Sequence, residues 1–329
     1  MNRYAQFNQC GQPQDVLSVA TAPIPTPADG ELLVEMLAAP INPADINFVQ
    51  GVYGLKPQFP DSVAGLEGFG VVKQSQSPDY QVGDQVILLN GVGAWAQFLC
   101  APAADFIKIP QQVDPMQACM LKVNPLTAWL ALTQYVTLQE GDWVVQNAAN
   151  SGVGRCVIQL CKAMGLRSIN IVRKPDELRD ELMSLGADIV VGEDDADLVK
   201  SVIAATGGVR PKLASNCVGG DSATRLMDML APAGTMVTFG AMSKKSIKVP
   251  NGFLIFKNIS LRGLWCTQWV KNATHEQVLD AYMHLADIMA AGKLTQAIDS
   301  VYSIDDIQSA ALKAQEEYRS GKVLLKLKD

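Results

Sequence analysis

From Trp143 onward, short apolar runs alternate with segments of helical periodicity, and this alternation constrains the fold more than any other feature of the sequence. Six runs have the composition of buried strands: 143–147, 168–173, 189–191, 213–218, 235–239 and 259–264. Helices are expected after the first three runs, at 153–164, 176–185 and 198–205. Repeated strand–helix units predict an α/β fold with a parallel, doubly wound sheet. Six strands match the two mononucleotide-binding halves of a Rossmann domain.

The remainder of the chain has a different pattern. The first part, roughly 120 residues, is rich in proline and glycine and contains short apolar runs such as Glu31–Leu37 and Gln85–Leu89. This pattern favours a partly open β-barrel or a sandwich. The C-terminal part contains amphipathic helical segments at Gln277–Ala291 and Ile304–Arg319 and a final strand at Lys322–Leu327. We expect this end to return to the first domain. The predicted domains are therefore residues 1–122 with 268–329, and residues 123–267.

The bulk properties argue against several classes of protein. The net charge is −6 and there is no basic block, which argues against nucleic-acid binding. No stretch is apolar for long enough to span a bilayer, and the N-terminal residues lack the plan of a signal peptide. The seven cysteines include no C-x-x-C pair, so we expect reduced, buried thiols. The expected compartment is the cytoplasm, or the mitochondrial matrix if a transit peptide has been removed.

A candidate phosphate loop lies where the first predicted strand meets its helix. The run Q-N-A-A-N-S-G-V-G, residues 146–154, exposes backbone N–H groups at a helix N-terminus, and such groups bind phosphate. It departs from G-x-G-x-x-G, because Ala149 and Ser151 take the first two glycine places and Gly154 keeps the third. The strand–loop–helix–strand context favours dinucleotide binding. The alternative is a glycine-rich turn that holds no ligand.

The end of the second predicted strand distinguishes between the two nicotinamide cofactors. An acidic residue there binds the ribose 2′-OH of NAD, whereas an arginine accommodates the 2′-phosphate of NADP. This chain has Arg173 and Lys174 at that place, and a guanidinium group pairs well with phosphate. The sequence therefore predicts NADPH as the cofactor. The alternative is a solvated Arg-Lys turn.

A zinc site is not expected. Catalytic zinc requires three ligands from cysteine, histidine, aspartate or glutamate. The two histidines, His275 and His284, lie nine residues apart in an amphipathic helical region, where we expect them to face solvent. No cluster of cysteines is present that would hold a structural zinc ion.

Several segments together resemble the zinc-free branch of the medium-chain dehydrogenase/reductase family. The similarity covers nearly the whole chain and is greatest to the mitochondrial-type trans-2-enoyl-thioester reductases. The segments that carry it are A-A-P-I-N-P-A-D-I-N (38–47), G-V-Y-G-L-K-P (51–57), V-N-P-L-T-A (123–128), 146–154, I-N-I-V-R (169–173), N-C-V-G-G (216–220), G-T-M-V-T-F-G-A-M (234–242), F-L-I-F-K (253–257), L-R-G-L-W (261–265) and S-G-K-V (320–323). Zinc-dependent relatives have G-H-E where this chain has Gly65-Leu66-Glu67.

The resemblance implies a GroES-like first domain and a role for each of several residues. Tyr53 would be the catalytic tyrosine near the substrate carbonyl. The cofactor would be held by Asn124, by the phosphate-loop residues Asn150, Ser151, Gly152 and Val153, by Arg173 and Lys174, by the nicotinamide-pocket residues Phe239, Gly240, Ala241, Met242, Leu264, Trp265, Cys266 and Thr267, and by Lys322. Lys174-Pro175 departs from the family, which often has an acidic residue and a second arginine there. The alternatives are that Tyr53 only packs a turn and that Phe239 and Trp265 are only core residues.

The implied reaction is reduction of the C2=C3 double bond of an enoyl thioester, carried by CoA or by acyl carrier protein. Hydride from NADPH adds to Cβ, donors stabilise the charge that develops on the thioester oxygen, and a proton then adds at Cα. The cleft between the two domains is the expected site. Two alternatives stay open: an NADPH:quinone oxidoreductase, and a non-catalytic NADPH-binding regulatory or structural protein.

The resemblance also implies a homodimer formed through the edge strand Ile259–Leu264. Lys244, Lys245 and Lys248 would suit an acidic carrier protein, although clustered lysines are usually solvated surface. Acyl chain length does not follow from the sequence.

Overall fold

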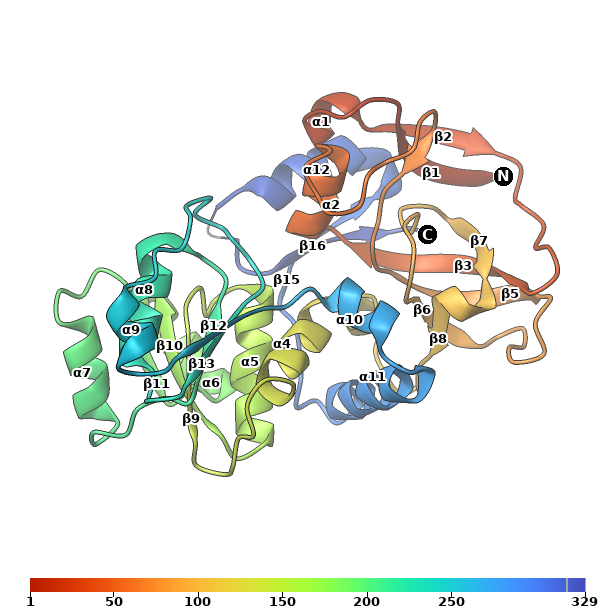
Figure 1. Ribbon diagram of the computed structural model, residues 1–329. Coiled ribbons are helices and arrows are strands. Elements are labelled where there is room, and N and C mark those ends of the chain that lie inside the picture. The colour runs from red at the N-terminus through yellow and green to blue at the C-terminus, as the bar shows by residue number, and fades with distance from the viewer. Residues whose placement is uncertain (318, 329) are drawn as a thin grey trace. The chain divides into compact units, whose positions relative to one another are not determined.

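The computed structural model describes residues 1–317 and 319–328, which form two compact units (Figure 1). Unit 1 contains residues 1–123 and 275–329, and unit 2 contains residues 124–274. Tyr318, inside the predicted helix at Ile304–Arg319, and Asp329, at the end of the predicted first domain, lie outside the described residues. The boundary expected at 267/268 would place residues 268–274 in the first domain. The structure has them in unit 2, because the helix at Cys266–Asn272 packs against the helix at Asn124–Thr133.

Unit 2 is built on a six-stranded sheet in which every pairing is parallel. Its strands are β9 (Trp143–Gln146), β10 (Arg167–Val172), β11 (Ile189–Gly192), β12 (Leu213–Asn216), β13 (Thr235–Thr238) and β14 (Ser260–Gly263). The spatial order is β11-β10-β9-β12-β13-β14. The chain therefore runs outward from β9 in one direction, then returns beside β9 and runs outward in the other. This arrangement confirms the predicted doubly wound Rossmann sheet and places its topological switch point between β9 and β12.

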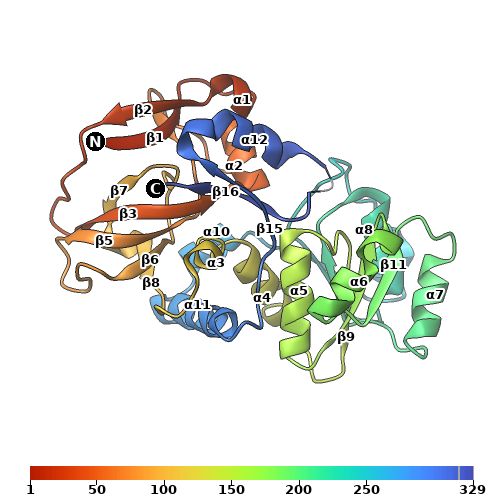
Figure 2. The ribbon, with the colours of Figure 1, turned by 180° about the vertical axis from the view of Figure 1, so that it is seen from behind.

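Helices cover this sheet, and Figure 2 shows α5 and α6 on its near side. The helices are α4 (Asn124–Thr133), α5 (Gly152–Ala163), α6 (Pro175–Leu185), α7 (Leu198–Ala205), α8 (Gly220–Met229), α9 (Asn251–Ile255) and α10 (Cys266–Asn272). Helix α6 ends as predicted at Gly186, whose φ of 112° lies in the left-handed region that glycine tolerates. The periodicity of α5 predicts one buried face, on which Val157, Leu160 and Cys161 are buried and Val153 and Met164 are half-buried. Helices α4, α8, α9 and α10 are missing from the sequence prediction.

Unit 1 contains two sheets. The smaller has the order β2 (Ser18–Ala22), β1 (Asn2–Phe7), β4 (Ser62–Val63). The larger runs β15 (Ile298–Ser303), β16 (Lys322–Lys326), β3 (Glu31–Pro40), β5 (Phe69–Ser75), β6 (Gln85–Leu88), β8 (Phe106–Lys108), with β7 (Phe98–Pro102) also paired to β3. All its pairings are antiparallel except β15–β16. The sheets form an open arrangement, in agreement with the partly open β-structure that was expected. Strand β16 pairs with β3, so the C-terminal segment returns to the first part of the chain, as expected.

The helices of unit 1 are α1 (Pro13–Val16), α2 (Pro43–Val49), α3 (Pro115–Ala118), α11 (His275–Ala290) and α12 (Ile307–Gln315), with 3-10 turns at η1 (Ala103–Asp105) and η2 (Ile304–Asp306). The helix expected over Ile304–Arg319 is therefore the turn η2 followed by α12, which ends at Gln315. Both histidines lie exposed on α11, as expected. The cysteines are only partly as expected, since Cys10 is exposed and Cys119, Cys156 and Cys161 are buried. None of the helices in the described residues has the length and apolar character needed to cross a membrane.

Candidate dinucleotide-binding site

The loop between β9 and α5 has the geometry of a phosphate-binding turn. Ser151 is the N-cap of α5, and its Oγ accepts a hydrogen bond of 3.1 Å from the backbone N–H of Gly154. A Cβ on Gly154 would lie 2.6 Å from the carbonyl oxygen of Ala149, so only glycine lets the helix approach the loop this closely. This is the place at which the dinucleotide fingerprint keeps its third glycine. The first N–H groups of a helix lack partners within the helix, and here they suit a pyrophosphate.

Hydrogen bonds from buried side chains support this loop. The Nε2 of Gln146, a residue that is 1% exposed, donates to the carbonyl oxygen of Gly154 at 2.9 Å and to Oδ1 of Asn170 at 2.8 Å. Arg155 Nε donates to the carbonyl oxygen of Asn150 at 3.0 Å, and its guanidinium pairs with Glu181. The loop therefore keeps its shape through contacts within unit 2.

The predicted 2′-phosphate residues lie at the carboxyl end of β10. Arg173 directly follows the strand and Lys174 is the N-cap of α6, and both are exposed. The Nζ of Lys174 lies 3.0 Å from a carboxylate oxygen of Glu177. Both cations therefore stand one strand away from the phosphate loop, since β10 pairs directly with β9.

A hollow of about 640 Å³ lies beyond the ends of β13 and β14. Of the predicted nicotinamide-pocket residues, Phe239, Gly240, Ala241, Leu264 and Trp265 line it. Met242, Cys266 and Thr267 are outside that lining, and Met242 is 62% exposed. The lining also includes residues that the sequence analysis did not select: Tyr135, Thr238, Gly263, Gln268 and Trp269. The Tyr135 hydroxyl donates to the carbonyl oxygen of Gly263 at 3.0 Å, a contact across 128 residues that no local pattern reveals.

Tyr53 and Lys322 belong to unit 1, whereas Asn124 is the first residue of α4 in unit 2 and is buried. Tyr53 lies on the loop after α2, where its backbone N–H donates to the carbonyl oxygen of Asn47 at 3.1 Å. Its half-buried ring packs against the hydrophobic core of unit 1. Lys322, at the start of β16, donates through Nζ to Oδ1 of Asn42.

A buried polar network around Asn42 was not predicted. Asn42 Nδ2 donates to Glu67 Oε1 at 2.6 Å, and Glu67 Oε2 accepts from the N–H of Val123 at 2.9 Å. Burial raises the pKa of Glu67, while the charge of Lys322 and the bond from Asn42 oppose that rise. Burial also raises the pKa of Asp45, to about 6. Glu67 belongs to Gly65-Leu66-Glu67, the segment in which zinc-dependent relatives have a histidine. The sequence therefore did contain a signal for this network.

Within residues 1–317 and 319–328, no three histidine, cysteine, aspartate or glutamate side chains come together in a way that would hold a metal ion. The expectation of zinc-free chemistry stays a prediction.

Comparisons with known proteins agree with this geometry. Residues 28–111 match the alcohol dehydrogenase GroES-like domain, and residues 152–283 match the zinc-binding dehydrogenase model. The chain is 38% identical to the mitochondrial enoyl-acyl-carrier-protein reductase of Xenopus tropicalis, over 97% of this chain and 93% of that protein. It is 39% identical to the human protein of the same name, over 97% of this chain and 87% of that protein.

Solved structures extend the comparison. The mitochondrial 2-enoyl thioester reductase heterodimer Etr1p/Etr2p of Candida tropicalis is 31% identical, with a TM-score of 0.89 and 99% of each chain covered. A quinone oxidoreductase of Pseudomonas syringae is 27% identical, with a TM-score of 0.87, and the match covers 99% of this chain and 100% of that one. The chain therefore belongs to the medium-chain dehydrogenase/reductase family and, within it, to the group of the mitochondrial enoyl-acyl-carrier-protein reductases.

Proposed function

We propose that this protein reduces the C2=C3 double bond of 2-enoyl thioesters with NADPH. The observation that carries the proposal is a dinucleotide loop with Arg173 and Lys174 beside it, in a chain 38% identical over nearly its full length to a protein named enoyl-acyl-carrier-protein reductase. A solved relative named Etr1p is described as a complex with NADP and crotonyl-CoA, at 31% identity and a TM-score of 0.89.

The residues of unit 2 fit this cofactor. The N-terminus of α5, with Asn150, Ser151, Gly152 and Val153, would bind the pyrophosphate. Arg173 and Lys174 would bind the 2′-phosphate. Asn124 and the segments 239–242 and 264–267 would orient the nicotinamide, with Lys322 as a further contact. When bound, NADPH supplies the hydride, and the chain's own residues supply orientation and charge stabilisation.

Tyr53 is the proposed catalytic residue. Reduction at Cβ places negative charge on the thioester oxygen, and a hydrogen-bond donor aimed at that oxygen lowers the barrier. A phenol keeps its proton at neutral pH and can donate there or pass a proton toward Cα. The two glycines of the loop, Gly51 with a φ of 74° and Gly54, give the backbone the freedom to present the ring.

The test is oxidation of NADPH, followed by the loss of its absorbance, with crotonyl-CoA, longer enoyl-CoAs and simple quinones. Turnover of enoyl thioesters supports the proposal. Turnover of quinones alone supports the second candidate, an NADPH:quinone oxidoreductase, which the similarity to the Pseudomonas syringae enzyme favours. Binding of NADPH without turnover of any acceptor supports the non-catalytic alternative.

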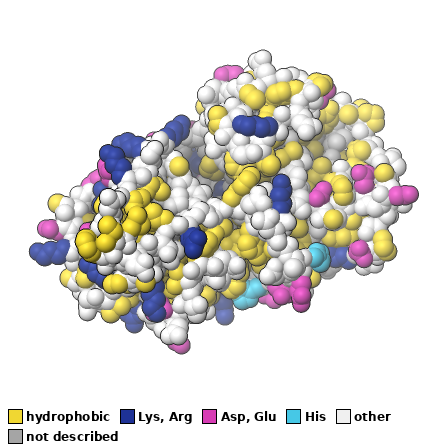
Figure 3. Space-filling view, viewed as in Figure 1, with side chains coloured by type: hydrophobic (Ala, Val, Ile, Leu, Met, Phe, Trp, Pro, Cys, Tyr) yellow, Lys and Arg dark blue, Asp and Glu magenta, His cyan; other side chains and the backbone are white. Residues whose placement is uncertain are grey.

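We also propose that two copies pair through β14. This strand is the outer strand of its sheet, and Leu254, Ile255 and Phe256 just before it are 45%, 69% and 85% exposed. Figure 3 shows hydrophobic side chains gathered over α9. An unpaired edge beside an exposed apolar patch is the usual mark of an interface. The Candida tropicalis relative is described as an Etr1p/Etr2p heterodimer.

The carrier and the compartment are proposed from the relatives' names. Lys244, Lys245 and Lys248 are exposed and would suit the acidic surface of an acyl carrier protein. The relatives are named as mitochondrial proteins, so the mitochondrial matrix is favoured, and the expected cytoplasmic location finds no support in them.

A further inference from the structure

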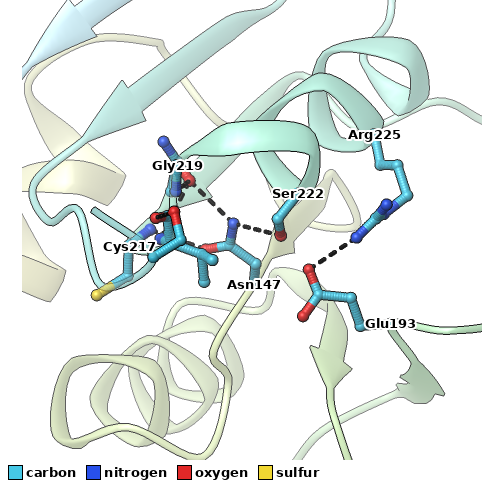
Figure 4. Close-up of polar contacts among 9 residues, drawn as sticks. Asn147, Glu193, Cys217, Gly219, Ser222 and Arg225 are labelled. Atoms are coloured by element: carbon cyan, nitrogen blue, oxygen red, sulfur yellow. Dashed lines mark hydrogen bonds and ion pairs between the residues drawn. The ribbon is translucent and has the colours of Figure 1, made fainter. Parts of the chain in front are cut away.

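Two buried amides meet at the switch point of the sheet in unit 2. Asn147 directly follows β9 and Asn216 is the last residue of β12, and their exposures are 2% and 0%. Asn147 Nδ2 donates to Asn216 Oδ1 at 2.9 Å, across 69 residues of sequence. Figure 4 shows Asn147 with its partners Ser222 and Cys217. In open α/β sheets the ligand binds outside the carboxyl ends of the strands at this point. The pair therefore lies directly under the proposed cofactor site.

The orientation of both amides is fixed by backbone donors. Asn147 Oδ1 accepts from the N–H of Cys217 at 2.8 Å, and a backbone N–H can only donate. Asn147 Nδ2 must then face Asn216 Oδ1 and Ser222 Oγ, which lies 3.0 Å away on α8. Asn216 Oδ1 also accepts from the N–H groups of Val218 and Gly219, at 3.3 and 3.1 Å. Together the two side chains hold three consecutive backbone N–H groups.

The segment 217–219 in turn holds the segment 240–243. The carbonyl oxygen of Cys217 accepts from the N–H of Met242 at 3.0 Å, and the carbonyl oxygen of Val218 accepts from Ser243 Oγ at 2.7 Å. A Cβ on Gly240 would lie 2.8 Å from Cys217 Sγ, so these two residues are already in close contact. A shift of 217–219 must therefore move 240–243, which includes three of the residues proposed at the nicotinamide.

We propose that Asn147 is a positioning residue for the nicotinamide half of NADPH, acting through 217–219 and 240–243. The inference rests on the proposed NADPH site and deepens it. Asparagine suits this place because one side chain must accept from Cys217 and donate to two oxygens. The hydrogen bonds of the Asn147 side chain go to Asn216, Ser222 and the N–H of Cys217, whereas the 2′-phosphate half is proposed to depend on Arg173, Lys174 and α5. Loss of the amide should therefore affect the two halves of the cofactor unequally.

The test uses Asn147→Asp, which keeps the shape and an acceptor but removes both donated bonds. Isothermal titration calorimetry on the full-length protein would measure binding of NADPH and of 2′,5′-ADP, a probe that lacks the nicotinamide half. NADPH affinity should fall by about tenfold while 2′,5′-ADP affinity stays within about twofold. Turnover of crotonyl-CoA at saturating NADPH should also fall, because a misplaced nicotinamide lowers kcat as well as binding.

Asn2→Asp is the matched control. Asn2 is also a buried asparagine, and its amide donates to the carbonyl oxygen of Phe98 and accepts from the N–H of Phe98, both at 2.9 Å, within unit 1. Both variants should lower Tm, but only Asn147→Asp should bind NADPH more weakly. Unchanged NADPH binding by Asn147→Asp, equal loss of both probes, or an equal loss of NADPH affinity in Asn2→Asp would overturn the inference. Should the Asp variant not fold, Asn147→Ala is measured by the same criteria. A wild-type protein that binds no NADPH would instead overturn the proposed function.

Discussion

The ammonium group of Lys174 donates to both carboxylate oxygens of Glu177, each at 3.0 Å, on the exposed first turn of α6. Lys174 follows Arg173 at the end of β10, where we propose that the 2′-phosphate binds. Glu177 therefore places a negative charge beside a cation that the phosphate is expected to use. An exposed ion pair is worth only about 0–1 kcal/mol, so a phosphate can displace the carboxylate.

Replacement of Glu177 by glutamine should consequently strengthen NADPH binding. We expect a gain of about two- to fivefold for NADPH and none for NADH, which has no 2′-phosphate. Calorimetric titration with both cofactors measures this difference. Asp180→Asn removes the same charge one turn further along the exposed side of α6 and is the control. An equal gain for NADH, or an equal gain from the control, would contradict the prediction.

Arg173→Ala should weaken NADPH far more than NADH, because the guanidinium contributes only where a 2′-phosphate is present. In the wild-type protein, NADPH at 100 times its dissociation constant should stabilise the fold by about 2.7 kcal/mol. Thermal unfolding with and without each cofactor measures both effects. Equal shifts in Tm with NADPH and NADH in the wild-type protein would refute the assignment of the 2′-phosphate site.

Much of unit 2 could be predicted, because a buried parallel strand leaves a local signal. The six strands and α5, α6 and α7 follow from apolar runs and helical periodicity within single segments. Helix α8 carried a signal as well, since Ala223, Leu226, Met227 and Leu230 follow the spacing of a helix and are buried. At its start the helix has Gly219 and Gly220, whose φ values are 82° and 53°. Two consecutive glycines are typical of a loop, so the start of the helix could not be recognised from the sequence.

The polar networks could not be predicted, because their partners are distant in sequence. Lys322 and Asn42 are 280 residues apart, and Asn147 and Asn216 are brought together only by the strand order. The lining of the hollow beside Trp265 could not be predicted either, because Tyr135, which follows α4, is distant from Trp265 in sequence. Many of the proposed site residues were selected by resemblance to the family. The side chains that hold those residues in place could be identified only from the structure.

Stability should depend on pH through Asp45. Burial raises the pKa of this carboxyl from its ordinary value of 3.8 to about 6, so the folded state keeps the proton that the unfolded chain has lost. Between these two pH values the native state binds more protons, and the contribution of Asp45 to stability falls as pH rises. Compared with Asp45→Asn, the wild-type protein should lose about 1–3 kcal/mol of relative stability as pH rises from 4 through the folded-state pKa of about 6, and the difference should level off about one pH unit above that value.

Urea unfolding of both proteins across that pH range measures this difference. The comparison with Asp45→Asn matters because carboxyls with lowered pKa values, such as those of Asp84 and Asp142 beside lysines, change the total stability in the opposite direction. A constant difference between the two proteins from pH 4 to pH 6 would show that Asp45 ionises normally in the folded state.

Phe256→Glu should convert the proposed dimer to a monomer. This side chain is 85% exposed beside the outer strand β14, and a carboxylate buried against a second apolar surface is strongly unfavourable. Light scattering at micromolar concentration gives the mass. Leu312→Glu, at a 53% exposed position on α12 of unit 1, is the control and should leave the mass unchanged. A monomeric wild-type protein would contradict the proposed dimer. A dimeric Phe256→Glu variant would show that the interface does not include Phe256.

Tyr53→Phe should impair chemistry while leaving cofactor binding intact. The ring is half-buried against the core of unit 1, and phenylalanine preserves that packing while removing only the hydroxyl. General acid catalysis contributes on the order of 10²–10⁴-fold, so kcat with crotonyl-CoA should fall by a factor in that range. NADPH affinity should barely change, because the phosphate loop belongs to unit 2.

Tyr80→Phe is the control for the loss of a tyrosine hydroxyl in the same unit. Its hydroxyl donates to the carbonyl oxygen of Phe106 at 2.8 Å, so the variant should lower Tm without lowering kcat. Steady-state kinetics on both variants, together with NADPH titration, separate a catalytic hydroxyl from a structural one. If Tyr53→Phe keeps full turnover of enoyl thioesters, the tyrosine is a packing residue. A quinone reductase would tolerate that loss, because reduction of a quinone requires no proton at Cα.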